Sequence, residues 1–130
     1  MDKIAAVQNK IAQYLVDNVF EPWEEIVMNC ELSEKTKNLS CALFYITNDP
    51  NDRRKGDIKL TSELTHLLRK LNDVYYKKSG ERWGIFDLII DSSGKYKFEF
   101  SYEKPKRLNG IFDEESHYRF ENYLDKYKNQ

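Results

Sequence analysis

The most constraining feature of this sequence is a stretch near residue 100 in which aromatic and polar residues alternate. The aromatic residues occupy every second position, at Tyr96, Phe98, Phe100 and Tyr102. The positions between them are polar, at Lys95, Lys97, Glu99 and Ser101. Successive side chains of a strand point to opposite faces, so this pattern predicts a strand with one aromatic face. We expect that face to form a sheet surface packed beneath helices rather than a stacking site for a ligand.

The residues before this strand predict its hairpin partner. An apolar run begins at Trp83 and ends with Leu88-Ile89-Ile90, and Asp91-Ser92-Ser93-Gly94 follows it as a turn sequence. Two strand-like runs separated by a short segment of turn formers are typical of a β-hairpin.

Three segments show the three-and-four residue spacing of amphipathic helices. The first stripe runs from Ile4 to Asn18, with Asp2 as a candidate N-cap. The second runs from Leu60 to Tyr75, with Thr61 or Ser62 as a cap and Gly80 as a left-handed terminator. The third is a closing helix capped by Asp113, whose expected buried side comprises Phe120, Tyr123, Leu124 and Tyr127.

Two further strands are predicted between the first and second helices. Residues 26–32 alternate with one face toward a core, and residues 39–46 are apolar on both faces, as in a central strand. Residues 47–57 and 103–110 are rich in turn formers and predict loops. The order α-β-β-α-β-β-α predicts a single α+β domain over residues 1–130, built on an antiparallel sheet of about four strands.

Composition narrows the class of protein. The chain has 130 residues with 21 Lys and Arg against 22 Asp and Glu, a formal net charge of −1. This balance argues against a general nucleic-acid or membrane-surface binder.

The sequence also bears on the location of the protein. No apolar run approaches the roughly 18–20 residues of a membrane span. Met1-Asp2-Lys3 leads into an amphipathic pattern without a signal segment, which favours a cytoplasmic protein. Cys30 and Cys41 are expected to be buried free thiols, although a cross-strand disulfide is geometrically feasible.

The sequence contains no recognisable catalytic, cofactor-binding or metal-ligating set. The two histidines, His66 and His117, lack the spacing of a metal motif, and the cysteines do not form a Cys-x-x-Cys pair. The glycines match no phosphate-binding loop. Carboxylates are plentiful, but most fall at turns or helix starts, where solvated caps are the simpler interpretation. A small hydrolase that combines loop acids with a histidine remains an alternative.

Several segments together carry a resemblance to a known family. They are the sequences EPWEEIVMNCEL, ALFYI and RWGIFDLIIDSSGKYKFEFSYEKP. Their most specific part is a strand introduced by Trp83, the turn Ser93-Gly94-Lys95 and the aromatic strand after it, and Trp23 after the first helix fits as well. The chain thereby resembles the YezG-like family of bacterial immunity proteins. That resemblance implies an antidote to a secreted or contact-delivered toxin, and several partners of the family are nucleases.

An inhibitor of a nuclease competes for a cationic cleft, so surface carboxylates and aromatic anchors are the expected contacts. The candidate toxin-binding residues are Asp49, Asp52, Asp57, Asp91, Tyr102, Phe112, Asp113, Glu114 and Glu115. The expected partner is a toxin catalytic domain, with no direct binding of nucleic acid or membrane and no cofactor. Another alternative is an adaptor that binds nucleic acid or a regulatory protein through Arg53–Lys55 and Lys104–Arg107. The sequence leaves the identity of the toxin and the oligomeric state open.

Overall fold

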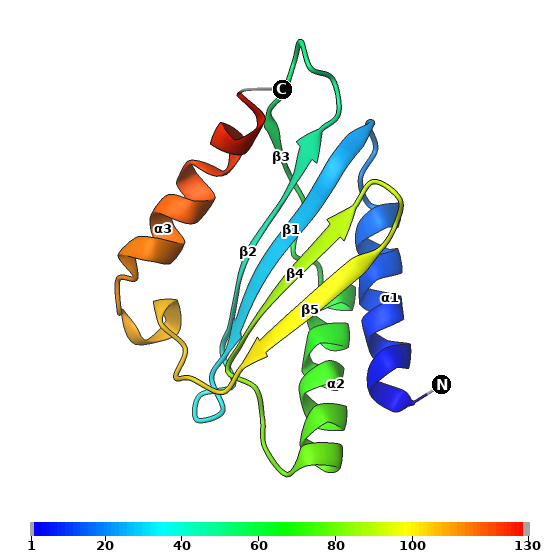
Figure 1. The fold of residues 1–130 in the computed structure, drawn as a ribbon. Coiled ribbons are helices and arrows are strands. Elements are labelled where there is room, and N and C mark those ends of the chain that lie inside the picture. The colour runs from blue at the N-terminus through cyan, green and yellow to red at the C-terminus, as the bar shows by residue number, and fades with distance from the viewer. Residues whose placement is uncertain (1, 129–130) are drawn as a thin grey trace.

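A computed structural model describes residues 2–128 and shows a five-stranded antiparallel sheet with helices on both faces (Figure 1). The helices are α1 (Lys3–Asp17), α2 (Ser62–Ser79) and α3 (Glu114–Glu121), and two 3₁₀ helices are η1 (Arg107–Asn109) and η2 (Tyr123–Tyr127). The strands are β1 (Trp23–Leu32), β2 (Leu39–Thr47), β3 (Lys55–Asp57), β4 (Ile85–Asp91) and β5 (Tyr96–Ser101). The predicted α+β class and antiparallel sheet are confirmed.

The strand order is β3-β2-β1-β4-β5, so β1 lies at the centre of the sheet. Cys30 on β1 pairs with Cys41 on β2 and with Phe86 on β4, and Phe86 pairs in turn with Phe100 on β5. The predicted hairpin therefore forms, and its turn is the Asp91–Gly94 segment. Cys30 and Cys41 are free thiols as expected, but only Cys30 is buried, whereas Cys41 is partly exposed; burial raises the pKa of Cys30.

The expected strand number of about four is one too low, because β3 forms inside the segment that the sequence predicted as a loop. Lys55–Asp57 pairs with Phe44–Ile46 at the edge of the sheet. Gly56 permits this pairing, since a Cβ atom there would overlap the ring of Tyr45. A three-residue strand with a central glycine lacks the alternation that identifies longer strands.

The termini of α1 and α2 follow the predicted signals, whereas Asp113 occupies the N-cap position of α3 without a side-chain cap hydrogen bond. The Asp2 side chain accepts a hydrogen bond from the Ala5 amide at 2.9 Å, and the Thr61 hydroxyl accepts one from the Leu64 amide at 3.2 Å. Gly80 ends α2 in the left-handed conformation with φ of 79°. No helix among residues 2–128 is long and apolar enough to cross a lipid bilayer.

The main core lies between one face of the sheet and the helices α1 and α2, which run antiparallel across it (Figure 1). The fully buried large side chains of this layer are Ile11, Leu15, Ile26, Met28, Leu64, Leu68, Leu71, Trp83, Phe86, Leu88 and Ile90. The aromatic face of β5 packs against them through Tyr96, Phe98 and Phe100. Tyr102 lies just beyond β5 and is half exposed.

The opposite face of the sheet is covered by residues 103–128, which we call the C-terminal segment (Figure 1). Its apolar contact is a second cluster in which Phe120, Tyr123, Leu124 and Tyr127 pack on Val27, Phe44 and Ile46. The predicted buried side of the closing helix is thus correct, but that helix is divided into α3 and η2. Because this cover lies over β1, the strand is buried on both faces rather than on one as the sequence predicted.

Candidate functional site

The C-terminal segment is anchored at its far end on the carboxylate of Glu25. This β1 side chain is buried, and it accepts hydrogen bonds from the hydroxyls of Tyr123 and Tyr127, the latter at 2.6 Å. Lys126 Nζ forms an ion pair with the same carboxylate at 2.7 Å. A buried charge is tolerated only when it is paired and hydrogen-bonded. Burial is the main cause that raises the pKa of Tyr127, and the hydrogen bond to Glu25 raises it further.

A second anchor lies where η1 crosses β1 and β2. Arg107 Nη1 donates to Asn29 Oδ1 at 2.6 Å, and its Nε and Nη2 donate to the hydroxyl and carbonyl oxygens of Ser40 at 3.0 and 3.1 Å. The buried Glu31 carboxylate accepts from the Leu108 amide at 3.2 Å and lies 3.6 Å from Arg107. The fork of the guanidinium therefore fixes the start of the segment on the sheet.

Between these anchors, Arg119 of α3 binds the Asp87 carboxylate of β4 through two hydrogen bonds of 3.2 Å each. The buried Asn29 amide also donates to Asp87, at 2.8 Å. The three anchors hold α3 against the sheet at a fixed position, which is a form of preorganisation.

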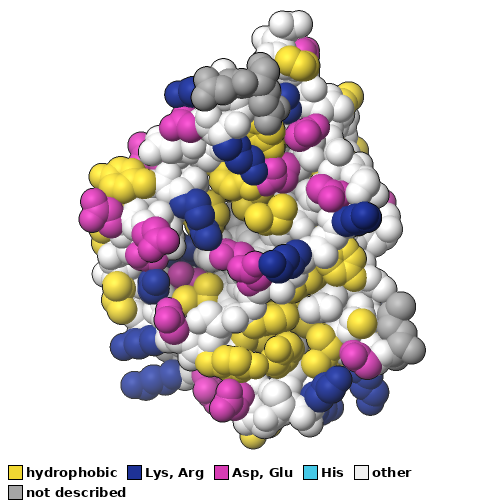
Figure 2. Space-filling model, viewed as in Figure 1, with side chains coloured by type: hydrophobic (Ala, Val, Ile, Leu, Met, Phe, Trp, Pro, Cys, Tyr) yellow, Lys and Arg dark blue, Asp and Glu magenta, His cyan; other side chains and the backbone are white. Residues whose placement is uncertain are grey.

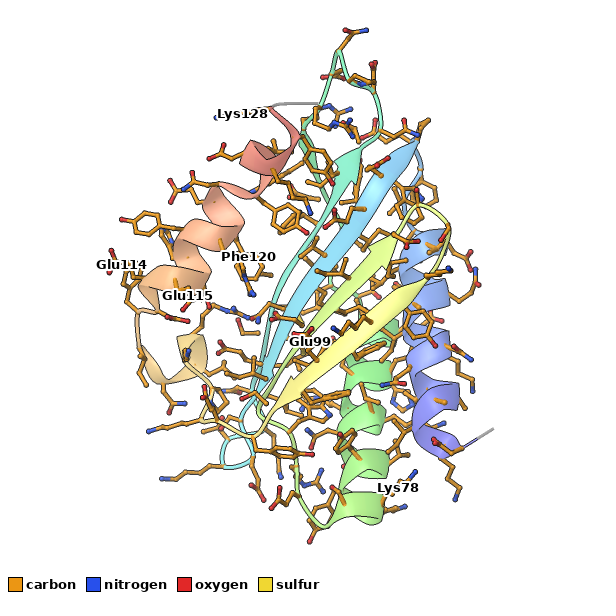
Figure 3. All side chains as sticks on the ribbon, viewed as in Figure 1. Lys78, Glu99, Glu114, Glu115, Phe120 and Lys128 are labelled. Atoms are coloured by element: carbon orange, nitrogen blue, oxygen red, sulfur yellow. The ribbon has the colours of Figure 1, made fainter. Side chains whose placement is uncertain are left out.

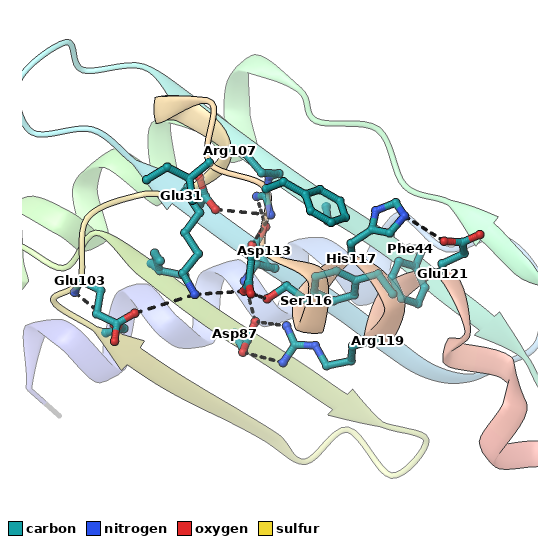
Figure 4. Close-up of a pocket in the computed structure, with 18 of the residues that line it drawn as sticks. Glu31, Phe44, Asp87, Glu103, Arg107, Asp113, Ser116, His117, Arg119 and Glu121 are labelled. Atoms are coloured by element: carbon teal, nitrogen blue, oxygen red, sulfur yellow. Dashed lines mark hydrogen bonds and ion pairs between the residues drawn. The ribbon is translucent and has the colours of Figure 1, made fainter.

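A cavity of about 510 Å³ remains between the start of α3 and the sheet (Figure 4). Its floor is apolar and includes Ala42, Phe44 and Ile85, and charged side chains of both signs line its walls. The charged lining residues are Glu31, Lys55, Asp87, Glu103, Lys106, Arg107, Asp113, Arg119 and Glu121, and His117 lines the cavity as well. Such a cavity can accept a polar or charged side chain from a partner protein.

The groups along the cavity wall are already paired with one another. Lys106 Nζ lies 3.0 Å from Asp113, and Ser116 Oγ donates to the same carboxylate at 2.6 Å. These hydrogen bonds from Ser116 and Lys106 lower the pKa of Asp113, and the bond to Asp113 raises the pKa of Lys106. His117 Nε2 is 2.9 Å from Glu121. The Ser116 hydroxyl and the His117 imidazole therefore have separate partners and do not form a nucleophile–base pair.

The same segment carries an exposed apolar and acidic surface that includes the cavity-lining residues Phe112 and His117. Phe112 is 67% exposed and Tyr118 is 48% exposed, and both rings pack on His117, with ring centroids 5.1 and 5.2 Å apart. Glu114 and Glu115 lie between the two aromatic residues in the sequence and form no ion pair with any residue in 2–128. Figure 2 shows acidic side chains along the outer side of α3, and in Figure 3 Glu114 points away from the sheet. We call residues 111–118 with Glu121 the α3 surface.

The structure brings only part of the predicted site together. Phe112, Asp113, Glu114 and Glu115 lie together at the start of α3. Tyr102 instead contacts Tyr75 of α2, with ring centroids 6.3 Å apart, and the hydrogen bond to Tyr75 raises the pKa of Tyr102 to about 12. It therefore lies on the other side of the sheet from Phe112.

The predicted loop acids lie elsewhere, and three of them, Asp49, Asp52 and Asp91, have local partners. Asp49 and Asp52 lie in the β2–β3 loop, where Asp49 accepts from the Asn51 amide at 2.9 Å. Asp57 ends β3 and is exposed. Asp91 accepts from the Ser93 amide and hydroxyl at 2.9 and 2.6 Å, and the Ser93 hydroxyl lowers the pKa of Asp91.

Several residues of this region escape prediction from sequence. The local sequence does not identify Glu31, Arg119 or Tyr118. Glu31 alternates with apolar residues in β1, which predicts a solvent-facing position, and the contacts of Arg119 depend on how the C-terminal segment crosses the sheet. The available signal is the closing segment, where cations and aromatic residues recur together at Arg119, Phe120, Tyr123, Lys126 and Tyr127. This combination of cations and aromatic residues indicates that the closing segment packs against a face of the sheet that carries carboxylates.

The two alternative functions gain little from the geometry. His66 is exposed on α2, across the sheet from His117, so the two histidines do not converge. Among residues 2–128, His, Cys, Asp and Glu side chains form no group of three or more that could hold a metal ion. In the basic cluster Arg53–Lys55, two side chains already bind other parts of the chain. Arg54 forms an ion pair with Glu21 at 2.7 Å, and Lys55 donates a hydrogen bond to the Phe120 carbonyl.

Comparison with models of known protein families identifies a match. The family model described as "Immunity protein YezG-like" matches residues 53–127, which include β3, α2, the β4–β5 hairpin and almost all of the C-terminal segment. No curated protein matches the chain.

Proposed function

The chain belongs to the YezG-like family of immunity proteins, and we propose that it protects its own cell by binding and neutralising the catalytic domain of a cognate toxin. We further propose that the toxin is a nuclease delivered by a competing cell, that inhibition takes place in the cytoplasm, and that the chain itself performs no catalysis. The contact region is the α3 surface.

The observation that carries this proposal is the combination of exposed aromatic rings and unpaired carboxylates on α3. Interface energy concentrates in a few large side chains that become fully desolvated, and aromatic residues are enriched among them. Phe112 and Tyr118 are side chains of this kind that are exposed in the free chain. Glu114 and Glu115 supply negative charge beside them, which suits a nuclease cleft that holds phosphates.

The anchoring of α3 supports the same function. Binding costs less when the contact surface is already ordered, because fewer side chains and loops lose freedom in the complex. The three contacts at Glu25, Asn29 and Asp87 fix α3 before a partner arrives. The cavity beside the surface offers a place where a toxin lysine or arginine can exchange partners with Asp113 or Glu121.

Co-expression with the toxin domain encoded beside this gene tests the proposal. We expect cells to survive toxin expression only when the chain is present, the two proteins to co-purify, and the purified chain to suppress cleavage of DNA or RNA by the toxin. Absence of both protection and co-purification contradicts the immunity function. Protection against a toxin that cleaves no nucleic acid retains immunity and contradicts the nuclease assignment.

A matched pair of variants locates the interface. The double substitution Phe112→Ala/Tyr118→Ala removes both exposed rings from the α3 surface, whereas Tyr76→Ala removes a ring that is 45% exposed on α2. We expect the first variant to lose protection and the second to retain it. Equal protection by both variants contradicts the α3 surface as the contact region.

A further inference from the structure

A second surface feature lies on the other side of the molecule, between α1 and α2. These helices run antiparallel, so the start of α1 lies beside the end of α2 (Figure 1). Between them is an open groove of about 680 Å³ whose apolar lining residues are Ile4, Ala6, Val7 and Val74. The remaining lining residues are Asp2, Lys3, Lys10, Lys70, Lys77 and Lys78. We call this the lysine groove.

The charge of the lysine groove departs from that of the whole chain. Five lysines and one acid line it, whereas the chain carries a net charge of −1. Asp2 is already engaged, since it caps α1 and lies 3.5 Å from Lys78. The other four lysines form no ion pair with any residue in 2–128. Unpaired like charges beside an apolar floor favour an anionic partner.

The spacing of the lysines matches a helix laid along the groove. Lys3 and Lys10 on α1 are seven residues apart, and so are Lys70 and Lys77 on α2. Seven residues of helix span about 10.5 Å, or roughly two turns, so each side of the groove presents cations at the same interval. An amphipathic helix can place apolar side chains on the floor between them and acidic side chains toward both rims.

The lining residues favour a protein segment over a nucleic acid. Single-stranded nucleic acids bind to grooves where bases stack on aromatic rings or on arginine, and the groove is lined by neither type of residue. We therefore propose that the lysine groove binds an acidic amphipathic helix of a protein partner. This site is independent of the α3 surface, because the sheet separates the two, so both can be occupied at once.

A peptide titration tests the proposal. The probe is a synthetic helical peptide of about five turns with leucine on one face and glutamate at positions flanking it, and the control is a scrambled peptide of the same composition. We expect the amphipathic peptide to shift NMR resonances of α1 and α2, with little effect on α3, and to bind more weakly at higher salt. Binding of both peptides with equal affinity, or no binding at about 1 mM peptide, contradicts the proposal.

Charge-reversal variants provide the matched control. Lys10→Glu/Lys70→Glu reverses one cation on each rim, and Lys35→Glu/Lys104→Glu makes the same charge change at two exposed positions outside the groove. We expect the first variant to weaken peptide binding about tenfold or more and the second to change it less than about twofold. Equal weakening in both variants shows a general charge effect and overturns the site. Resonance shifts in α1 and α2 with a DNA oligonucleotide or anionic vesicles, but not with the peptide, overturn the choice of partner.

Discussion

Asp87 in β4 accepts two hydrogen bonds from the Arg119 guanidinium of α3, each 3.2 Å long. Thirty-two residues separate the two side chains in the sequence. Together with the amide of Asn29, they connect the central strand, its neighbour and the closing helix. This contact is one of the three anchors that set the position of the α3 surface over the sheet.

The two partners of this contact are expected to differ in their mutational cost. Arg119→Ala removes a half-exposed ion pair and should lower the free energy of unfolding by about 1 kcal/mol or less. Asp87→Ala also leaves the buried amide of Asn29 without its acceptor and should cost about 1–3 kcal/mol. Urea unfolding of the two variants measures the difference. A larger cost for Arg119→Ala contradicts the assigned role of Asn29.

The buried carboxylate of Glu25 gives a second stability prediction. Glu25→Gln keeps the shape of the side chain but removes the charge that Lys126 and the two tyrosines bind, so we expect a loss of about 2–4 kcal/mol. Glu24→Gln is the control at the adjacent, less buried position and should change stability by about 0.5 kcal/mol or less. Thermal unfolding compares them, and equal effects of the two substitutions disagree with the anchoring of η2 on Glu25.

Gly56 is expected to tolerate a side chain only when Tyr45 is reduced in size. Gly56→Ala places a methyl group against the Tyr45 ring and should cost about 1–3 kcal/mol through overpacking. In a Tyr45→Leu background the same substitution should cost clearly less. A double-mutant cycle by urea unfolding gives the coupling directly, and additive costs speak against the overlap.

The start of α3 should loosen in acid. Hydrogen bonds from Ser116 and Lys106 depress the pKa of Asp113 below its ordinary value of 3.8. A depressed carboxylate pKa contributes stability that is present above the unfolded-state value and is lost as the pH falls through the folded-state value. We therefore expect faster amide exchange or altered NMR shifts at residues 113–121 as the pH falls below about 3.8. Asp113→Asn should remove this local transition, and an unchanged transition in that variant assigns it to another group.

The sequence predicted the fold well where one face of an element contacts the main core. The alternation of β5, the stripes of α1 and α2 and the hairpin turn each depend on neighbours close in the chain or on simple periodicity. The second face of the sheet was harder to predict. No local pattern in the sequence predicts that Glu25 and Glu31 are buried, because their partners Tyr127 and Arg107 lie far along the chain.

The candidate site shows the same difference between features set by nearby residues and features set by residues far along the chain. The cluster Phe112–Glu115 could be identified because a helix start and its flanking aromatic residue are local features. Tyr118 and the cavity wall could not, because they depend on how residues 103–128 cross the sheet. The loop acids show the converse. Asp91 has the charge and turn position expected of a contact residue, but its carboxylate accepts a hydrogen bond from Ser93 within its own turn.

Isothermal titration calorimetry with the toxin's catalytic domain tests the central claim most directly. Wild-type chain, Phe112→Ala/Tyr118→Ala and the control Tyr76→Ala are titrated under the same conditions. Loss of two aromatic anchors should weaken binding by about 3 kcal/mol or more, which is over a hundredfold in Kd, while Tyr76→Ala should leave Kd within about threefold of wild type. An unchanged Kd for the double variant, with its fold intact by circular dichroism, would contradict the claim that the chain acts by presenting α3 to a toxin.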